Sequence, residues 1–351
     1  MIASSYNEYM LMDALNLSAN ELLKLKLFSD LFKGSDDENK KLYRHLLKKW
    51  HPDMNTTDTS NVFVHITQLY DSLSIAVSPK SVEINGKEYP YMYSVSKDLY
   101  DIYYTDNGRG FLINFKKKNS EIKQNFLANT NSIQTLLRGH KFESRYQDLL
   151  SCKLYENKEF AKVFLPEGYV PLNLLTKYIV DFKDWKISAY IISRLYDTAL
   201  MYKAANLSCI GFDLDFIFVD TKKHQIVDLS ALFFSNMIDH NLTLALSPQQ
   251  ASSFVKSDLD KRVCSEKSIN NMILSTGLIL AGDLNRCGNI KMLDDSANKD
   301  MVSVIAGIDI SKPIRENYEQ WQTKSVKRLF NERSFYKKEI VMSDLVKYIG
   351  G

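Results

Sequence analysis

The hydrophobic and polar positions of residues 40–73 follow two helical repeats separated by a short break. The first repeat places Tyr43, Leu46, Leu47 and Trp50 at helical spacing, and the second places Phe63, Ile66, Tyr70 and Leu73 on one side. His51-Pro52-Asp53 lies between them, and its proline biases the preceding residue away from helical geometry. Residues 58–60 offer an N-cap for the second repeat. The pattern predicts two antiparallel helices joined by a tight bend.

The first of these helices also carries a basic face. Its cationic residues are Lys40, Lys41, Arg44, Lys48 and Lys49. A rigid, positively charged helix steers and orients an encounter with an acidic surface. Two alternatives stay open: the basic face is simply solvated, or His51 is a charge that the C-terminus of a helix favours.

The combination of basic helix, His-Pro-Asp bend and partner helix resembles the J domain of DnaJ-type co-chaperones. The partner helix matches through Phe63, Ile66, Leu69-Tyr70 and Leu73. The resemblance implies that His51, Pro52 and Asp53 stimulate ATP hydrolysis by a DnaK-type 70-kDa heat shock chaperone. Asp53 would engage an arginine of the chaperone, and the five cationic residues would orient the complex. A scaffold that binds the chaperone without stimulating it is an alternative.

The segment before the basic helix completes the expected J domain, which we place at residues 25–76 after an N-terminal helical extension at 1–24. Leu23, Leu27, Phe28 and Leu31 predict the first helix of that domain. The polar run 34–37 then ends this helix and supplies an N-cap for the basic helix. The extension itself shows a helix start at 18–21.

Composition narrows the class of protein. The chain has 351 residues, 45% of them hydrophobic, which favours two or three domains. The 45 basic and 42 acidic residues leave a net charge of +3, so the overall charge gives no reason to expect nucleic-acid binding. The four cysteines form no CxxC pair, which argues against a zinc module and a disulfide framework. Without an apparent signal peptide or membrane span, the expected location is the cytoplasm, with no membrane partner, metal or cofactor.

After a linker at 77–81 the pattern predicts strands first and helices later, an α+β arrangement. Strands are expected at 88–95, 99–105, 111–115 and 159–165, with a turn at 106–110 and a helix at 120–138. A long helix is expected at 185–205, followed by a strand pair at 216–219 and 225–227.

This order resembles the two-lobed protein-kinase fold, with a first lobe at 82–165 and a second at 166–351. The segments that carry the resemblance are LYDIYYT, GRGFLINF, FLPEGYVPL at 164–172, and SCIGFDLDFIFVDTKKHQIVDLS at 208–230. Asp228 stands where the resemblance places a metal-binding aspartate. We therefore expect a multidomain α+β protein, with an all-α J-domain hairpin followed by a kinase-like fold.

The positions that phosphoryl transfer needs are mostly altered. Residues 94–104 contain no glycine, so close approach of backbone to phosphate is hindered. Asn114 falls at the strand lysine, with Lys116 as a shifted substitute, and Asn129 falls at the acidic partner. Gly211 and Phe216 replace the catalytic aspartate and the magnesium-binding asparagine. Asp228, Asn114 and Lys116 therefore form at most a vestigial nucleotide or metal site, and no catalytic residue is assigned.

The sequence thus predicts a J-domain co-chaperone whose catalytically inactive kinase-like part binds an unknown client or partner. The rival interpretation is a nucleotide-dependent phosphotransferase regulated by its J domain. Basic and aromatic residues near the C-terminus could also contact nucleic acid, although a solvated helix face is the preferred interpretation. They are Lys324, Lys327, Arg328, Arg333, Phe335, Tyr336, Lys337 and Lys338.

Overall fold

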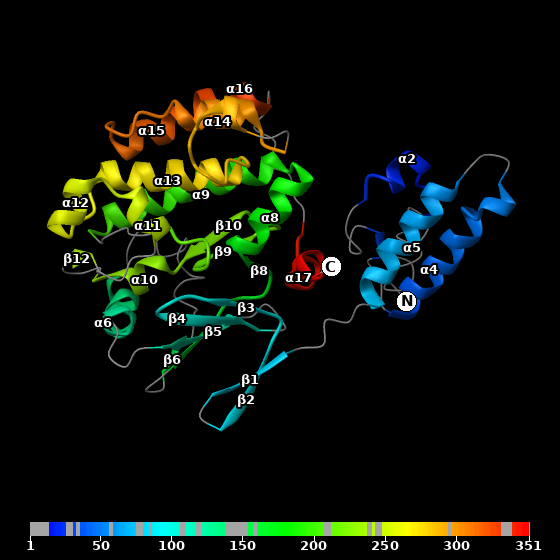
Figure 1. Cartoon of the computed structure of the whole chain (residues 1–351), viewed down its shortest axis with the longest axis horizontal. Coiled ribbons are helices and arrows are strands. Elements are labelled where there is room, and N and C mark those ends of the chain that lie inside the picture. Colours follow the sequence, from blue (N-terminus) through cyan, green and yellow to red (C-terminus); the bar gives the residue numbers. More distant parts are fainter. Residues whose placement is uncertain are drawn as a thin grey trace. The chain divides into compact units, whose positions relative to one another are not determined.

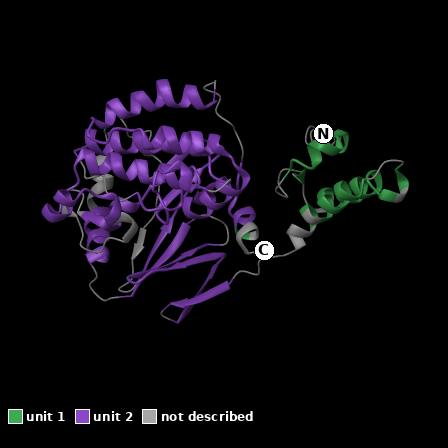
Figure 2. Cartoon of the chain, turned by 45° about the horizontal axis from the view of Figure 1, so that its top comes forward, with its two compact units in different colours: residues 1–78, 346–351 green, residues 79–345 purple. Residues whose placement is uncertain are grey.

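The computed structural model divides the chain into two compact units, residues 1–78 with 346–351 and residues 79–345 (Figure 2). It describes residues 14–25, 31–32, 36–55, 59–74, 80–84, 86–105, 110–116, 121–137, 154–156, 160–206, 212–236, 241–242, 248–293, 296–330 and 339–350. The division after residue 78 falls inside the predicted linker. Helices and small antiparallel sheets together give the mixed content of the predicted α+β class.

The first unit contains two consecutive helices with a short turn between them (Figure 1). Its elements are α2 (Ala19–Leu22), α4 (Asp36–Lys49), the 3-10 turn η1 (Pro52–Met54) and α5 (Ser60–Ser74). Tyr43 stacks on Tyr70 with ring centroids 3.7 Å apart, and His51 contacts Phe63 at 5.3 Å. Because later residues of α4 face earlier residues of α5, the two helices run antiparallel, as the pattern predicts.

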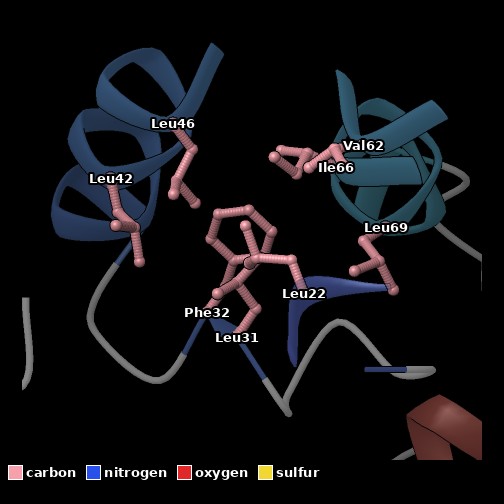
Figure 3. Close-up of a cluster of buried hydrophobic side chains, with 8 residues drawn as sticks. All are labelled: Leu22, Leu31, Phe32, Leu42, Leu46, Val62, Ile66 and Leu69. Carbon is pink, nitrogen blue, oxygen red and sulfur yellow. The ribbon is translucent and has the colours of Figure 1, made fainter. Parts of the chain in front are cut away.

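A small hydrophobic core holds this helix pair together (Figure 3). Its buried members are Leu22, Leu31, Phe32, Leu42, Leu46, Val62, Ile66 and Leu69. Tyr43, Leu47, Trp50 and Tyr70 pack at its margin and stay partly buried. The predicted apolar faces are therefore right in period but rotated, since Leu42, Val62 and Leu69 lie deeper than the predicted Tyr43, Phe63 and Tyr70.

The segment before α4 differs from the prediction. The helix start at 18–21 is confirmed, because Ser18 and Glu21 form a reciprocal capping box, but α2 ends at Leu22. Leu23 is exposed, so its prediction as a core residue is wrong, while Leu31 is buried. Leu27 and Phe28 lie outside the described residues. Leu22 shares the core of α4 and α5, so the boundary predicted after residue 24 separates residues that pack together.

The second unit begins with a β-rich part whose main sheet has the strand order β3-β4-β5-β7-β6, each neighbouring pair antiparallel. A separate hairpin pairs β1 with β2. The strands are β1 (Lys80–Ile84), β2 (Lys87–Tyr91), β3 (Tyr93–Ser96), β4 (Tyr100–Tyr104), β5 (Gly110–Phe115), β6 (Leu154–Glu156) and β7 (Phe160–Phe164). The single strand predicted at 88–95 is thus two strands in different sheets.

Local sequence explains the central strand pair of this sheet. β4 alternates buried and partly buried side chains, the period expected of a strand with one covered face. Gly110 opens β5 with φ of 147°, and a Cβ there would lie 1.9 Å from the carbonyl oxygen of Val163. Only glycine therefore lets β5 approach β7 at this position. The predicted turn residues 106–109 lie outside the described residues.

The remainder of the second unit is mainly helical, with short strands at its start. β8 (Tyr169–Pro171), β9 (Ile217–Asp220) and β10 (Gln225–Asp228) form one small sheet, and β11 (Ser235–Asn236) pairs with β12 (Asn241–Leu242). The helices are α8 (Leu172–Phe182), α9 (Trp185–Ala204), α10 (Ser230–Phe234), α11 (Pro248–Ser253), α12 (Lys256–Lys261), α13 (Glu266–Leu280), α14 (Lys299–Ala306), α15 (Ile314–Gln320) and α16 (Val326–Phe330). The 3-10 turn η2 (Ile290–Met292) and the π-helix η3 (Trp321–Ser325) lie among them. The last helix, α17 (Met342–Gly350), begins in the second unit and ends in residues assigned to the first.

Helix α6 (Glu121–Leu137) ties the sheet to this helical part. The Asn129 side chain is buried and donates to the carbonyls of Leu232 at 3.0 Å and Ser235 at 2.5 Å, with a longer contact to Ala231. Phe126 of the same helix stacks on Phe233. These contacts join α6 to α10 and fix the chain that follows β10.

Aromatic rings fill the space between the main sheet and β9. Phe111 of β5 stacks on Phe218 of β9 at 5.2 Å, and Tyr100 of β4 meets Phe216 edge to face at 5.4 Å. Tyr104 contacts both Phe111 and Phe218, and all these rings are buried. Large aromatic side chains contribute much of the apolar burial in a core, so the two parts share one continuous core.

Candidate functional site

The bend between α4 and α5 is held by side chains that bond to backbone carbonyls. Asn55 donates from Nδ2 to the carbonyls of Lys49 and His51, both at 2.9 Å. Thr59, which precedes α5, donates from Oγ1 to the carbonyl of Trp50 at 3.0 Å. Orphan carbonyls at a helix C-terminus need such partners. The bend therefore has a defined backbone, and Thr59 joins the end of α4 to the start of α5.

The predicted tripeptide occupies this bend. His51 and Pro52 are half-buried, and the His51 ring meets Phe63 edge to face. Pro52 and Asp53 begin the turn η1, and the amide of Met54 donates to the His51 carbonyl at 3.0 Å. The side chain of Asp53 lies outside the description. The tripeptide thus lies at the end of the helix pair, where His51 and Pro52 are neither deeply buried nor fully exposed.

The predicted basic residues all lie on the solvent side of α4. Lys40, Lys41, Arg44, Lys48 and Lys49 are exposed, whereas Leu42 and Leu46 on the opposite side enter the core. From Lys40 to Lys49 the helix contains no acidic residue. Since charges of one sign on one face add their fields, α4 is suited to an acidic surface.

Lys49 differs from the other four cations. Its Nζ donates to the carbonyls of Leu15 at 2.5 Å and Leu17 at 3.5 Å. It also lies 5.0 Å from the centre of the Trp50 ring. This ammonium therefore holds the N-terminal segment on α4, and a role for Lys49 in binding a partner stays a prediction.

The second predicted site surrounds Asp228, the last residue of β10. Its carboxyl is 3% exposed, and Oδ1 accepts from the amide of Ser230 at 2.9 Å. Oδ2 is buried and has no hydrogen-bond partner in the described structure. Burial raises the pKa of Asp228 to about 6, although the bonds from Ser230 oppose the rise. This aspartate is therefore a buried acid that titrates near neutral pH.

Two further aspartates lie near Asp228. The Oδ1 atom of Asp213 accepts from the amide of Asp215 at 2.9 Å, and the amide of Asp213 donates to Ser230 Oγ at 3.0 Å. Enclosure by protein and the adjacent Asp215 carboxylate raise the pKa of Asp213 to about 7. The three acids thus crowd one region on the N-terminal side of β9 and at the end of β10.

A lysine that sequence analysis missed neutralises part of this charge. Lys97, in the turn between β3 and β4, places Nζ 3.3 Å from Oδ2 of Asp215. Burial disfavours the charged ammonium, but Asp215 outweighs it and holds the pKa of Lys97 above its ordinary value. Asn173 of α8 donates to Oδ1 of Asp215 at 2.7 Å and to the hydroxyl of Tyr104. In the sequence, Lys97 lies within residues 94–104, the segment that lacks the glycines expected of a phosphate-binding loop.

Asn114 and Lys116 are not joined to Asp228 in this arrangement. Lys116 pairs with Asp101 at 2.9 Å and donates to the hydroxyl of Ser96 and the carbonyl of Lys97. Asn114 lies on β5 between Asp101 of β4 and Phe160 of β7 in the strand register. Lys116 as a substitute for a phosphate-binding lysine stays a prediction, and its observed contacts are with Asp101 and the β3–β4 turn.

Other predicted positions have structural roles or lie outside the description. Asn129 staples α6 to α10, as described above. Gly211 falls outside the described residues, as do Arg333, Phe335, Tyr336, Lys337 and Lys338 of the basic C-terminal stretch. Lys324, Lys327 and Arg328 are exposed on η3 and α16. Three exposed cations on a helix are the ordinary appearance of a solvated face.

The described part of the chain shows neither a metal-binding cluster nor a membrane-spanning helix. No three histidine, cysteine, aspartate or glutamate side chains converge there in a way that would hold a metal ion, and this includes Asp213, Asp215 and Asp228. Among the same residues, none of the helices has the length and apolar character to span a bilayer.

Neither comparison with known proteins assigns this chain to a family. No protein-family model matches this chain, and a search of curated proteins found no match either.

Proposed function

We propose that this chain is a J-domain co-chaperone whose α4 and His51-Pro52-Asp53 bend recruit a DnaK-type chaperone and stimulate its ATPase. The observation that carries the proposal is the end of the helix pair, where a bonded bend displays the tripeptide beside a helix with an exposed basic face. Charge on α4 accelerates and orients the encounter, and the fixed bend delivers the tripeptide in one conformation. The ATP is bound by the partner, so the chain needs no nucleotide of its own for this role.

The second unit is proposed to be a kinase-like module that binds a client or partner without catalysis. Support comes from the element order, since a five-stranded antiparallel sheet with α6 after its third strand precedes a helical part, as in protein kinases. Buried aromatic rings fill the space between sheet and β9, and Lys97 binds Asp215. Both features compete with a nucleotide for the same region. Among the described residues no lysine pairs with Asp228, so a phosphate bound beside it would lack the clamp that phosphoryl transfer needs.

The test measures the rate of ATP hydrolysis by a purified DnaK-type chaperone with increasing amounts of the full chain. Wild type is expected to accelerate hydrolysis, and His51→Gln is expected to reduce the acceleration at least about tenfold, or ~1.4 kcal/mol. His45→Gln is the matched control, since His45 is exposed on α4 and outside the tripeptide. Acceleration that His51→Gln leaves unchanged contradicts the proposal. Binding without acceleration supports the scaffold alternative.

The rival phosphotransferase function rests on the buried, unpartnered Oδ2 of Asp228. A magnesium–nucleotide complex that bound this atom would stabilise the folded chain, because a ligand selective for the native state raises its stability. Thermal unfolding with and without magnesium and ATP tests this. We expect no shift in Tm. A rise that Asp228→Ala abolishes would favour the phosphotransferase over the binding module.

A further inference from the structure

The bend end of the first unit displays apolar side chains as well as the tripeptide. Met54, which ends η1, is 70% exposed, and Val64, early in α5, is 51% exposed. Phe63, the neighbour of Val64, contacts the His51 ring. Met54 follows Asp53 directly in the chain. Two large apolar side chains are therefore in solvent at the same end of the helix pair as the tripeptide.

The backbone that carries Met54 is fixed. The amide of Met54 donates to the His51 carbonyl, and the next residue, Asn55, donates to the carbonyls of Lys49 and His51. An apolar side chain on an ordered turn loses less conformational entropy on binding than one on a flexible loop. Methionine is unbranched and polarizable, so it adapts to an irregular apolar recess.

The cations of α4 are not equally available to a partner. Lys40, Lys41, Arg44 and Lys48 are exposed along α4, but the ammonium of Lys49 is bonded to the carbonyls of Leu15 and Leu17. Of these five cations, Lys49 is the nearest to the bend in the chain, and it is already engaged within the first unit, whereas Met54 in the bend is largely exposed. A complementary surface needs acidic groups opposite α4 and an apolar recess opposite the bend.

We propose that Met54, supported by Val64, is the apolar anchor of a two-part docking surface whose other part is the basic face of α4. The occupant is a protein surface that places an apolar recess beside a row of carboxylates. The inference rests on the proposed function, which makes that occupant the DnaK-type chaperone, and it adds a specificity-determining contact outside the tripeptide.

The experiment measures the concentration of full chain that gives half-maximal stimulation of the chaperone ATPase. Met54→Ser is expected to raise this concentration about fivefold, since removing one well-buried apolar anchor at an interface has an effect of this size. Met54→Leu, which keeps the apolar volume, is expected to restore it. Met292→Ser is the matched control, because Met292 is 74% exposed in the second unit and outside the proposed surface.

The dependence on salt concentration distinguishes the contribution of the basic face from that of the apolar anchor. Arg44→Gln is expected to lower the dependence of the half-maximal concentration on ionic strength, whereas Met54→Ser leaves that dependence unchanged. An equal loss of salt dependence in both variants would overturn the apolar role. Circular dichroism checks that the exposed substitutions leave the helices intact.

Different results would refute the apolar anchor and the proposed co-chaperone function. If wild type stimulates, His51→Gln does not, and Met54→Ser behaves like Met292→Ser, the apolar anchor is refuted and the co-chaperone role stands. If wild type gives no stimulation, or His51→Gln stimulates normally, both are refuted.

Discussion

The bend of the first unit and the aspartate cluster of the second use similar residues in opposite ways. At the bend, polar side chains bond the backbone, and most cations of α4 remain in solvent. Around Asp215, the charged and polar groups Lys97 and Asn173 bond the carboxylate, and aromatic rings close the space. The first region leaves most of its charged groups in solvent, whereas the second uses its groups to join its own elements.

Truncating a core side chain of the α4–α5 helix pair should give the largest loss of stability. Leu46→Ala removes a fully buried side chain from the core of α4 and α5, and we expect a loss of about 2–5 kcal/mol in unfolding free energy. Hydrogen exchange of residues 36–74 in the full chain measures this loss. Leu23→Ala is the control, because Leu23 is 42% exposed and should change stability by less than about 0.5 kcal/mol. Equal effects would contradict the assigned core.

The staple between α6 and α10 should give the next largest effect. Asn129→Ala leaves buried carbonyls of Leu232 and Ser235 without their donor, and we expect a cost of about 1–3 kcal/mol. Denaturant unfolding followed by hydrogen exchange in α10 measures it. Asn125→Ala is the matched control on the same helix, since Asn125 makes one long contact to the carbonyl of Phe233 at 3.4 Å. A larger cost at Asn125 would refute the staple.

The buried acid predicts a pH dependence of stability. The pKa of Asp228 is about 6 in the folded chain against 3.8 for the ordinary group, so the folded state keeps a proton that the unfolded state releases between these values. The contribution of Asp228 to unfolding free energy therefore falls as pH rises from about 4 to about 6, and it is constant above this range.

Asp228→Asn should remove this part of the pH profile. The difference in unfolding free energy between variant and wild type should grow in favour of the variant across that window, by on the order of 1–3 kcal/mol. Chemical unfolding at several pH values measures it. A difference that is independent of pH would show that the pKa of Asp228 is the same in the folded and the unfolded chain.

The ion pair of the β3–β4 turn should have the smallest effect. Lys97 is partly exposed and Asp215 is buried, so Lys97→Met is expected to cost about 0–1 kcal/mol and to loosen the turn locally. Hydrogen exchange across residues 93–104 should increase, while the exposed Lys186→Met leaves this segment unchanged. Unchanged exchange in the Lys97 variant would show that the turn is held by the sheet alone.

Sequence periodicity was sufficient for elements whose signals are local. Pro52 after an amphipathic run predicts the end of α4, and the alternating pattern around residues 99–115 predicts the β4–β5 pair. Rotation of the helix faces was missed, because Leu42 and Tyr43 both satisfy a helical repeat and tertiary packing alone selects Leu42.

The roles of Asn129 and Lys97 depend on contacts distant in sequence. Asn129 bonds residues more than a hundred positions later, and Lys97 meets Asp215 across a similar separation. Spacing within one element carries no information about such partners. Lys116, which follows β5, likewise pairs with Asp101 beside it, a contact that spacing along the chain does not predict.

The most direct test of the co-chaperone account is a single-turnover measurement of ATP hydrolysis by a preformed chaperone–ATP complex mixed with the full chain. Wild type should accelerate the hydrolysis step, and His51→Gln should return it close to the unstimulated rate while His45→Gln does not. Hydrolysis that is equally fast with wild type and His51→Gln, or unaffected by either, would contradict the account.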